Sequence, residues 1–253
     1  MAEAEVTAAL LIVGNEILSG RTQDANLAYI AKGLNEVGVR LKEVRVVADE
    51  EAAIVAALNA LRAAYAYVFT TGGIGPTHDD ITAACVAKAF GVKLVRDPRA
   101  VERLLRQIAP ENLNEARLRM ANIPEGGELI DNPISQAPGF CIGNVYVMAG
   151  IPRIMQAMFD GIRHSLKGGK PMLSQSIDIY SGEGNIAAGL TEIQNARPGV
   201  EIGSYPFSRK GVFGTAIVAR GTDPAAVSEA IDAVRALARG QGARTEETGE
   251  GPR

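Results

Sequence analysis

The stretch that most constrains the fold is residues 68–82, where a short apolar run enters a glycine-rich loop and a helical pattern starts at Thr82. The loop holds Gly72, Gly73 and Gly75. Glycine tolerates positive φ and lets the backbone approach a ligand closely. A loop of this kind ahead of a helix offers unpaired N–H groups and a partial positive charge to a phosphate. We therefore interpret the segment as a phosphate-binding strand–loop–helix unit.

The same loop continues through Pro76, Thr77 and His78 into two adjacent carboxylates, Asp79 and Asp80. Carboxylates repel a phosphate unless a cation lies between them, so the composition predicts a phosphate and a divalent metal together. The loop is not a P-loop, because no Lys-Ser or Lys-Thr pair follows the glycines. A tight turn with a solvated acidic cap is the simpler alternative. A lone loop histidine beside two aspartates is usually solvated, so we do not assign it as the base.

Short apolar runs alternate with amphipathic helical patterns through the first part of the chain. Strands are expected at residues 8–13, 39–47, 67–70 and 92–95, with helices between them. This alternation is typical of βαβ units. It predicts an α/β fold with a mostly parallel sheet that helices cover on both faces. In such sheets, ligands bind outside the carboxyl ends of the strands.

Polar loops follow each of the first three expected strands. The first, residues 14–22, is long for a βα connection and begins Gly14-Asn15-Glu16. Asp49 follows the second strand, where we expect it to cap the next helix. The glycine loop follows the third. Because the carboxyl ends of parallel strands meet at one edge, we predict a single acidic rim beside the glycine loop.

Residues 123–139 are rich in proline and asparagine and predict a rigid, ordered loop that walls one side of a pocket. Residues 140–148 are expected to form a hairpin. Gly150 and Pro152 then make a turn before a helix at 153–166. This turn suits a second phosphate contact, although a plain turn fits almost equally well. Two helices are expected between the fourth strand and this loop, at residues 98–108 and 112–120.

The chain is predicted to form a first domain at residues 1–167 and a small α+β domain at residues 172–240. Residues 167–171 form the linker. The second domain has the order β-α-β-β-α, which can resemble an RNA-binding fold. A formal net charge of −3 gives no basic face for nucleic acid. Residues 241–253 have almost no apolar side chains and are expected to be disordered.

The remaining composition predicts a cytoplasmic protein. The two cysteines, Cys85 and Cys141, lack metal-type spacing and are expected to be buried thiols in a reducing compartment. The chain begins Met-Ala-Glu-Ala-Glu, which lacks the basic start of a signal peptide. No apolar run reaches the roughly 18 residues that a membrane helix needs. We expect no membrane partner.

The segment Thr70-Thr71-Gly72-Gly73-Ile74-Gly75-Pro76-Thr77-His78-Asp79-Asp80 resembles the signature of the MoaB/Mog molybdopterin-binding family. Further segments resemble the N-terminal domain of that family's CinA branch; they are residues 14–20, 47–50, 131–133 and 137–140. The resemblance covers residues 8–166 well. It implies a three-layer MoaB/Mog-type α/β domain, followed by the smaller α+β domain of the CinA branch.

The resemblance also implies a ligand class and residue roles. Family members bind a pterin or nucleotide phosphate at this rim, and CinA-type N-terminal domains hydrolyse ADP-ribose with a divalent cation. By resemblance, Asp80 takes the catalytic aspartate position and Asp49 a second acidic position. FAD synthases with a similar N-terminal part carry a nucleotidyl-transfer domain, and full CinA proteins carry a deamidase domain. The chain is expected to be too short for either.

Two positions depart from the family pattern. Ala149 stands before Gly150 where relatives usually have proline, and Ile154 stands where CinA-type sequences commonly have an acidic residue. If that acid helps to hold a metal in relatives, its absence here preserves ligand binding but weakens the case for hydrolysis.

The leading hypothesis is therefore a metal-dependent hydrolase of a phosphoanhydride bond, with Mg²⁺ or Mn²⁺ as the cation. Asp49, Asp79 and Asp80 would hold the metal. The ligand, a nucleotide, dinucleotide or molybdopterin, would contact Gly14, Asn15, Glu16, Thr71, Gly72, Gly73, Gly75, Pro76, Thr77, Gly150 and Pro152. The alternatives are a non-catalytic molybdopterin- or nucleotide-binding module and adenylyl transfer in molybdenum cofactor synthesis. Family precedent predicts a homo-oligomer.

Overall fold

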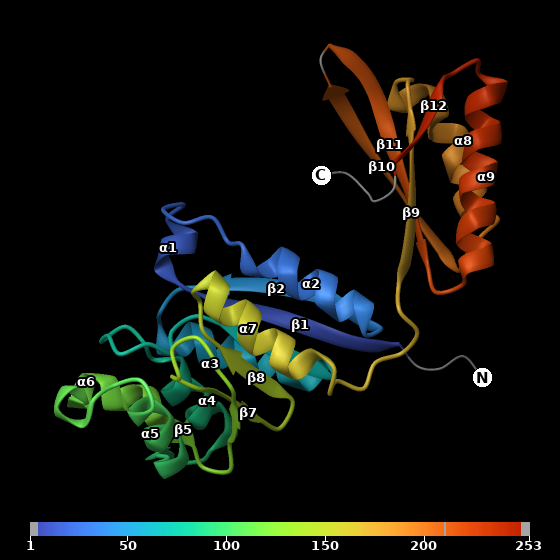
Figure 1. The fold of residues 1–253 in the computed structure, drawn as a ribbon. Helices are drawn as coiled ribbons and strands as arrows, with labels where there is room; N and C mark the ends of the chain where they lie inside the picture. The colour runs from blue at the N-terminus through green and yellow to red at the C-terminus, as the bar shows by residue number, and fades with distance from the viewer. Residues whose placement is uncertain (1–4, 210, 249–253) are drawn as a thin grey trace. The chain divides into compact units, whose positions relative to one another are not determined.

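The computed structural model describes residues 5–209 and 211–248. The chain divides into two compact units between Gly169 and Lys170. Each unit is described by itself (Figure 1). Within the described residues, no helix is both long enough and apolar enough to cross a membrane.

The first unit is built on a six-stranded sheet with the order β2-β1-β3-β8-β7-β6. The first four strands in that order are parallel, β7 pairs antiparallel with β8, and β6 pairs antiparallel with β7. Their bounds are β1 Val6–Val13, β2 Val39–Val47, β3 Tyr67–Thr71, β6 Glu128–Ile130, β7 Gly139–Ile142 and β8 Val145–Met148. The predicted mostly parallel sheet is confirmed, and so is the hairpin, in which β7 and β8 pair on either side of Gly143.

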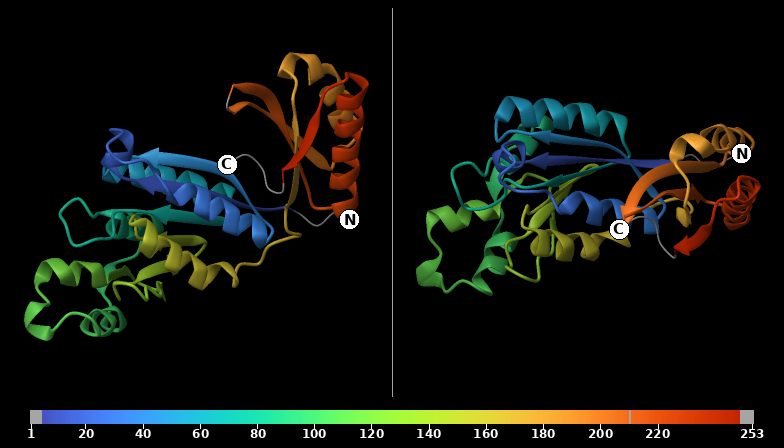
Figure 2. Two further views of the ribbon diagram at one scale, coloured as in Figure 1. Left: turned by 45° about the horizontal axis from the view of Figure 1, so that its top comes forward. Right: turned by 90° about the horizontal axis from the view of Figure 1, so that it is seen from above.

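Helices cover both faces of this sheet (Figure 2). Helices α3 and α4 pack on one face, and α2 and α7 on the other. The bounds are α2 Asn26–Glu36, α3 Glu51–Ala64, α4 Thr82–Phe90 and α7 Pro152–Arg163. Strand β1 shows why the layers form: Leu11 faces the first core, Leu10 faces the second, and both are fully buried. Burying one such side chain contributes about 2 kcal/mol.

Three local predictions were wrong. The expected fourth strand is β4 Leu94–Arg96, which pairs antiparallel with β5 Asn122–Pro124 and lies outside the main sheet. Its three side chains are all exposed, so it lacks the buried faces that a central parallel strand needs. The expected helix at 112–120 is shorter: α6 covers Glu115–Leu118, between 3₁₀ turns η1 Pro110–Asn112 and η2 Arg119–Ala121. The polar loop after β1 contains a short helix, α1 Asn15–Leu18.

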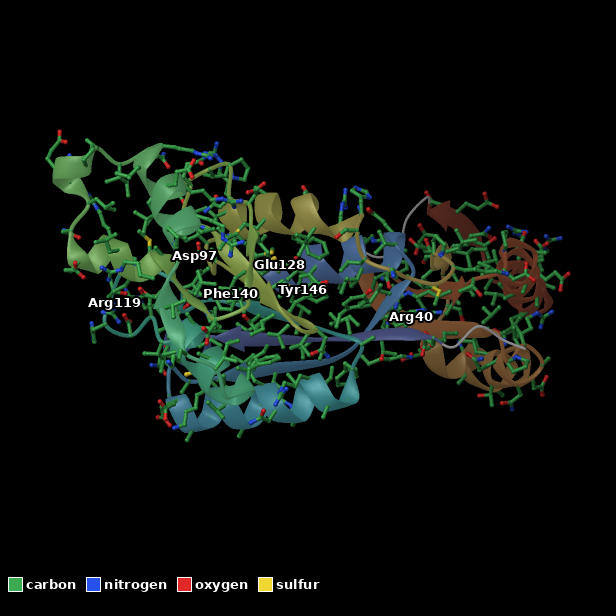
Figure 3. The ribbon with its side chains drawn as sticks, turned by 90° about the horizontal axis from the view of Figure 1, so that it is seen from below. Arg40, Asp97, Arg119, Glu128, Phe140 and Tyr146 are labelled. Atoms are coloured by element: carbon green, nitrogen blue, oxygen red, sulfur yellow. The ribbon has the colours of Figure 1, made fainter. Side chains whose placement is uncertain are left out.

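Helix α5, Pro98–Leu105, begins with the capping residue Asp97 (Figure 3). Asp97 Oδ1 accepts a hydrogen bond from the Arg99 backbone N–H at 2.8 Å, and Oδ2 accepts one from Arg99 Nη2 at 2.7 Å. Pro98 at the first helical position needs no N–H partner. The Arg99 guanidinium, followed by the backbone N–H, holds the pKa of this carboxyl below its ordinary value.

Asp97→Ala is expected to lower the free energy of unfolding by about 1–2 kcal/mol at pH 7, because it removes the cap. The carboxylate is favoured in the folded state, so its charge-dependent stabilisation is present above the unfolded pKa of about 4 and is lost as pH falls below it. Urea unfolding at pH 7 and pH 3 measures this. Asp97→Asn, which keeps an acceptor, is the control. An Asp97→Ala deficit that is equal at both pH values would contradict the ionic contribution.

The second unit is a four-stranded antiparallel sheet with the order β10-β11-β9-β12, and two helices pack on one of its faces (Figure 1). The elements are β9 Leu173–Ile179, α8 Glu183–Asn195, β10 Val200–Arg209, β11 Val212–Gly221, α9 Pro224–Gly240 and β12 Thr245–Thr248. This arrangement confirms the predicted small α+β domain.

The prediction of disorder from residue 241 onward was wrong for Thr245–Thr248, which form β12. This strand pairs antiparallel with β9, from Thr245 opposite Ile179 to Thr248 opposite Ser176. In addition, the Tyr180 hydroxyl donates to Glu246 Oε2 at 2.6 Å. Ladder hydrogen bonds join backbone groups and need no apolar side chains, so composition did not reveal the strand. Residues 249–253 lie outside the described part of the chain.

The two cysteines are free thiols in the structure. Cys85 is buried in α4, as predicted, and burial raises the pKa of its thiol to about 11. Cys141 is only partly buried, because β7 lies near the edge of the sheet.

Candidate functional site

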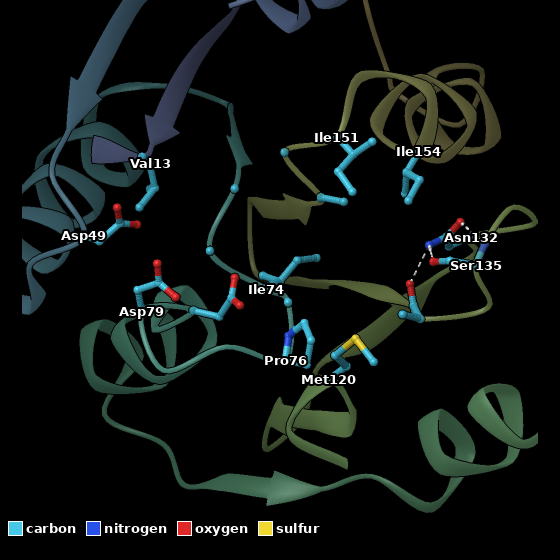
Figure 4. A pocket seen from close by; sticks show the side chains of 18 of the residues that line it. Val13, Asp49, Ile74, Pro76, Asp79, Met120, Asn132, Ser135, Ile151 and Ile154 are labelled. Carbon is cyan, nitrogen blue, oxygen red and sulfur yellow. Dashed lines mark hydrogen bonds between the residues drawn. The ribbon is translucent and has the colours of Figure 1, made fainter. Parts of the chain in front are cut away.

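A cavity of about 450 Å³ lies at the carboxyl ends of the parallel strands (Figure 4). The loops that follow β1, β2, β3 and β8 all contribute to it, as does the loop between β6 and β7. The lining residues are Val13, Gly14, Glu16, Asp49, Gly72, Gly73, Ile74, Gly75, Pro76, Asp79, Asp80, Met120, Asn132, Ser135, Ala137, Ala149, Gly150, Ile151 and Ile154. The predicted convergence of distant loops on one rim is therefore confirmed.

The first two loops are joined directly. Asp49 Oδ2 accepts a hydrogen bond from the Asn15 backbone N–H at 2.9 Å. The prediction that Asp49 caps the next helix is wrong, because Glu50 holds the cap position and makes no side-chain cap bond. The physical reason is that Asp49 is engaged with the N-terminus of α1 instead. Glu16, on the same short helix, lines the cavity beside Gly14, where a Cβ would lie only 2.6 Å from Glu16 Oε1.

The glycine loop after β3 has a backbone that requires glycine at two positions. Gly72 has a φ of +100°, and a Cβ there would lie 2.2 Å from the backbone oxygen of Val13. Gly73 has a φ of +67°, and a Cβ there would lie 2.2 Å from Thr82 Oγ1. The loop is closed by the Gly72 N–H, which donates to the Met148 oxygen at 3.2 Å.

Buried Thr82, the first residue of α4, fastens the loop to the helix. Its Oγ1 donates to the Gly72 oxygen at 3.0 Å, and its backbone N–H donates to the Gly73 oxygen at 3.0 Å. The backbone N–H groups of Gly73 and Gly75 have no acceptor among the described residues. The loop thus presents fixed donors at the rim.

Asp80 is oriented by Thr77. Its Oδ2 accepts from the Thr77 backbone N–H at 2.8 Å and from Thr77 Oγ1 at 2.5 Å. The missing Cβ of Gly75 makes room for this carboxylate, since a Cβ there would lie 2.7 Å from Asp80 Oδ2. Among the described residues, no backbone or side-chain group donates a hydrogen bond to Asp80 Oδ1. This oxygen is therefore available to a ligand.

Asp79 also faces the cavity (Figure 4). The pKa of its carboxyl is lowered, chiefly by the Thr77 side chain and then by its own backbone N–H; the charges of His78 and Arg119 add to this. The ionised form is thus favoured. The His78 side chain is 95% exposed and lies outside the cavity, in agreement with its interpretation as a solvated residue.

The opposite wall is a turn built around Asn132, which is 5% exposed. Its Nδ2 donates to Ser135 Oγ at 2.6 Å and to the Ala137 oxygen at 2.8 Å, and its Oδ1 accepts from the backbone N–H groups of Ile134 and Ser135. These bonds make the proline- and asparagine-rich loop rigid. It walls one side of the pocket, as predicted.

Not every predicted site residue lines the cavity. Asn15 and Thr77 are not among its lining residues, but their backbone N–H groups donate to Asp49 and Asp80. Thr71 is buried at the end of β3, and Pro152 starts α7. The predicted residues that do line it are Gly14, Glu16, Asp49, Gly72, Gly73, Gly75, Pro76, Asp79, Asp80 and Gly150.

Sequence reasoning missed several residues that build the site. Asn26 is 4% exposed, and its Nδ2 donates to the Gly150 oxygen at 2.8 Å, which fixes the turn after β8. Met120, the middle residue of η2, lines the cavity. Neither residue lies in a local sequence pattern that indicates a role in the site. The apolar side chains of Ile74, Ile151 and Ile154 complete the wall that faces the carboxylates (Figure 4).

The described residues contain no cluster of three or more His, Cys, Asp or Glu side chains arranged to hold a metal ion. The three aspartates therefore do not form the predicted metal site on their own. However, Asp49 and Asp80 line one cavity. In each carboxylate, Oδ2 accepts a hydrogen bond from the protein, which leaves Oδ1 as the oxygen that could bind a cation. One or two carboxylates completed by water and substrate phosphate is the usual arrangement for Mg²⁺. The donor set fits such a cation bound together with a ligand.

Comparison with known proteins finds a similar family for each unit. A family described as "Probable molybdopterin binding domain" matches residues 9–168, and one described as "FAD synthase, middle domain" matches residues 171–246. A protein from Archaeoglobus fulgidus is 35% identical over 197 residues, covering 78% of this chain and 84% of the relative. The structure of CinA from Thermoplasma acidophilum matches with a TM-score of 0.61 and 32% identity, covering 64% of this chain and 99% of that one.

Two longer relatives share this two-unit region. A "CinA-like protein" from Syntrophus aciditrophicus is 36% identical over 216 residues, which cover 78% of this chain and 50% of the relative. A "Probable FAD synthase" from Caenorhabditis briggsae is 30% identical over 255 residues, which cover 90% of this chain and 48% of the relative. The chain spans about half the length of these two relatives. It belongs to the MoaB/Mog molybdopterin-binding family, in the CinA branch.

Proposed function

We propose that this protein binds the phosphate of a nucleotide or pterin in the rim cavity and, with Mg²⁺ or Mn²⁺, hydrolyses a phosphoanhydride bond. One observation carries the proposal: unpaired backbone N–H groups of the glycine loop and the carboxylates of Asp49, Asp79 and Asp80 line the same cavity. Donors and carboxylates of this kind in one pocket suit an anion that arrives with a cation.

The glycine loop would hold the phosphate. The N–H of Gly72 is engaged with Met148, so we assign the phosphate contacts to the N–H groups of Gly73 and Gly75. Thr82 holds the loop at Gly72 and Gly73 before the ligand binds. Preorganised donors stabilise the charge that develops on a phosphoryl oxygen without reorganisation during the reaction.

The carboxylates would hold the cation. Asp80 and Asp49 would provide one oxygen each, with Asp79 facing the same space. A bound divalent ion polarises a phosphoryl oxygen and lowers the pKa of a coordinated water. Asp80 is kept in place for this role by its two hydrogen bonds to Thr77, and Asp49 by the N–H of Asn15. Glu16 lies where it can orient the attacking water or a ribose hydroxyl.

Incubating the purified protein with Mn²⁺ and, separately, ADP-ribose, FAD and other dinucleotides tests the activity. We expect release of a nucleoside monophosphate or phosphate from at least one of them and none in the presence of EDTA. If no product appears with any of these compounds while pterin or nucleotide binding persists, the hydrolase proposal fails.

A specific observation favours a second candidate, a non-catalytic module that binds molybdopterin or a nucleotide. Ile154, at a position commonly acidic in CinA-type sequences, lines the cavity and contributes only apolar surface. This apolar wall is therefore suited to pack against a flat pterin or nucleobase ring, whereas it provides no ligand for a metal. Adenylyl transfer to molybdopterin would use the same phosphate loop, and pyrophosphate release from ATP in the presence of molybdopterin distinguishes it from hydrolysis.

A further inference from the structure

The turn that follows β8 carries three consecutive residues of the rim cavity, Ala149, Gly150 and Ile151. Ile151 directly precedes α7, and it is 62% exposed at the cavity wall (Figure 4). A flat ring that packs against Ile151 removes this apolar surface from water, which favours binding. The position of the turn therefore decides how well a ring fits the site.

The side chain of Asn26, at the start of α2, ties this turn to the helix. Asn26 is 4% exposed, and its Nδ2 donates to the Gly150 oxygen at 2.8 Å. Its Oδ1 is buried and has no hydrogen-bond partner among the described residues, so the bond to Gly150 is the one that a substitution would remove. Asp24 fixes the backbone at this point, because its Oδ1 accepts from the N–H groups of Asn26 at 3.1 Å and of Leu27 at 2.8 Å. The amide is therefore directed at the turn before a ligand binds.

The glycine loop is held by other groups. The Gly72 N–H donates to the Met148 oxygen at 3.2 Å, and Thr82 Oγ1 donates to the Gly72 oxygen at 3.0 Å. Gly150 lies close to this loop, since a Cβ there would come within 3.2 Å of the Gly72 Cα. Neither bond that holds Gly72 involves Asn26. Loss of the Asn26 amide should therefore release the wall that faces the ring and leave the phosphate loop in place.

We propose that Asn26 is a positioning residue that sets the affinity of the site for the ring of its ligand. Asn26 does not line the cavity, so it acts through Gly150 by keeping Ile151 in place against the ring. A wall that is already ordered avoids the cost of ordering it during binding. This inference rests on the proposed function and adds to it, because it assigns the selection of a ring to a residue outside the cavity.

The test compares two probes that resist hydrolysis, by calorimetry with Mg²⁺: α,β-methylene-ADP, which carries a ring, and methylenediphosphonate, which does not. Asn26→Asp keeps the size of the side chain, but a carboxylate has no N–H to donate to Gly150. We expect roughly 10-fold weaker binding of α,β-methylene-ADP, the scale of one lost hydrogen bond. Binding of methylenediphosphonate should stay within about twofold of wild type, because the glycine loop keeps its own bonds.

Two further variants complete the comparison. An acidic side chain is favourable at the N-terminus of a helix, so Asn26→Asp should fold, and urea unfolding checks this. Asn26→Ala removes the amide without adding a charge and should show the same selective loss. Asn35→Asp is the matched control: it places the same substitution on an exposed residue near the end of α2 that does not line the cavity. It should change neither affinity.

Equal losses for both probes in the two Asn26 variants, or no loss for either probe, would overturn the positioning role. A loss confined to Asn26→Asp would be an effect of the added charge and would overturn it as well. Wild-type protein that binds neither probe would contradict the proposed function together with this inference. Wild type that binds both probes but leaves ADP-ribose intact with Mn²⁺ would remove only the hydrolysis, because the role of Asn26 is judged on affinity.

Discussion

Asp80→Asn is expected to lower Mn²⁺-dependent hydrolysis by on the order of 100-fold or more, the usual scale for losing one preorganised electrostatic group at a reacting phosphate. The change removes a negative charge next to the glycine loop. It preserves a carbonyl oxygen that can accept the Thr77 N–H, now donated at 2.8 Å. The measurement is the turnover rate with saturating ADP-ribose across a Mn²⁺ titration, together with the urea midpoint of each protein.

His78→Gln is the control for this experiment. Its side chain is 95% exposed and outside the cavity, so the rate should match wild type. Asp80→Asn should unfold within about 1 kcal/mol of wild type, because the side chain is only partly buried and can keep its local bonds to Thr77. A wild-type rate in Asp80→Asn, with the fold intact, would show that Asp80 is not the catalytic group. A loss of the hydrolysis rate in His78→Gln would show that His78 takes part in the reaction.

Gly72→Ala is expected to lower the free energy of unfolding by about 3 kcal/mol or more and to abolish phosphate binding. The new Cβ would lie 2.2 Å from a backbone oxygen of β1, and the residue would also have to keep a φ of +100°. Neither side can yield easily, since Val13 ends the central strand and the Gly72 N–H is held by Met148. Urea unfolding and nucleotide titration measure the two effects.

Gly126→Ala separates the collision from the backbone strain. Gly126 has a φ of +85°, yet a Cβ there would have no neighbour within 4 Å. This variant carries only the cost of the positive φ, roughly 1 kcal/mol. It should bind nucleotide as wild type does. Equal destabilisation in the two variants would mean that the contact between Gly72 and the Val13 backbone is unimportant.

Local patterns predicted the sheet and its layers well. The apolar run that became β1 is buried on both faces, and α4 covers the residues expected, from Thr82 to Phe90, with Gly91 in the left-handed conformation after it. Neighbouring residues are enough to reveal the period of a strand or helix and the glycine that ends a helix. Two of the failures, at β4 and β12, arose because pairing partners rather than composition determined the structure.

The site divides in the same way. The sequence by itself determined that the carboxylates and glycines follow strands, and the rule for parallel sheets then brings Asp49, Asp80 and the glycine loop to one rim. Only the tertiary structure decided which residues line the cavity: Asn15 and Thr77 donate to the carboxylates without lining it, whereas Met120 does line it. Asn26 and Gly150, 124 positions apart, meet because two helices and a strand pack together. Such contacts arise from packing across the whole unit, and no period or spacing in the chain encodes them.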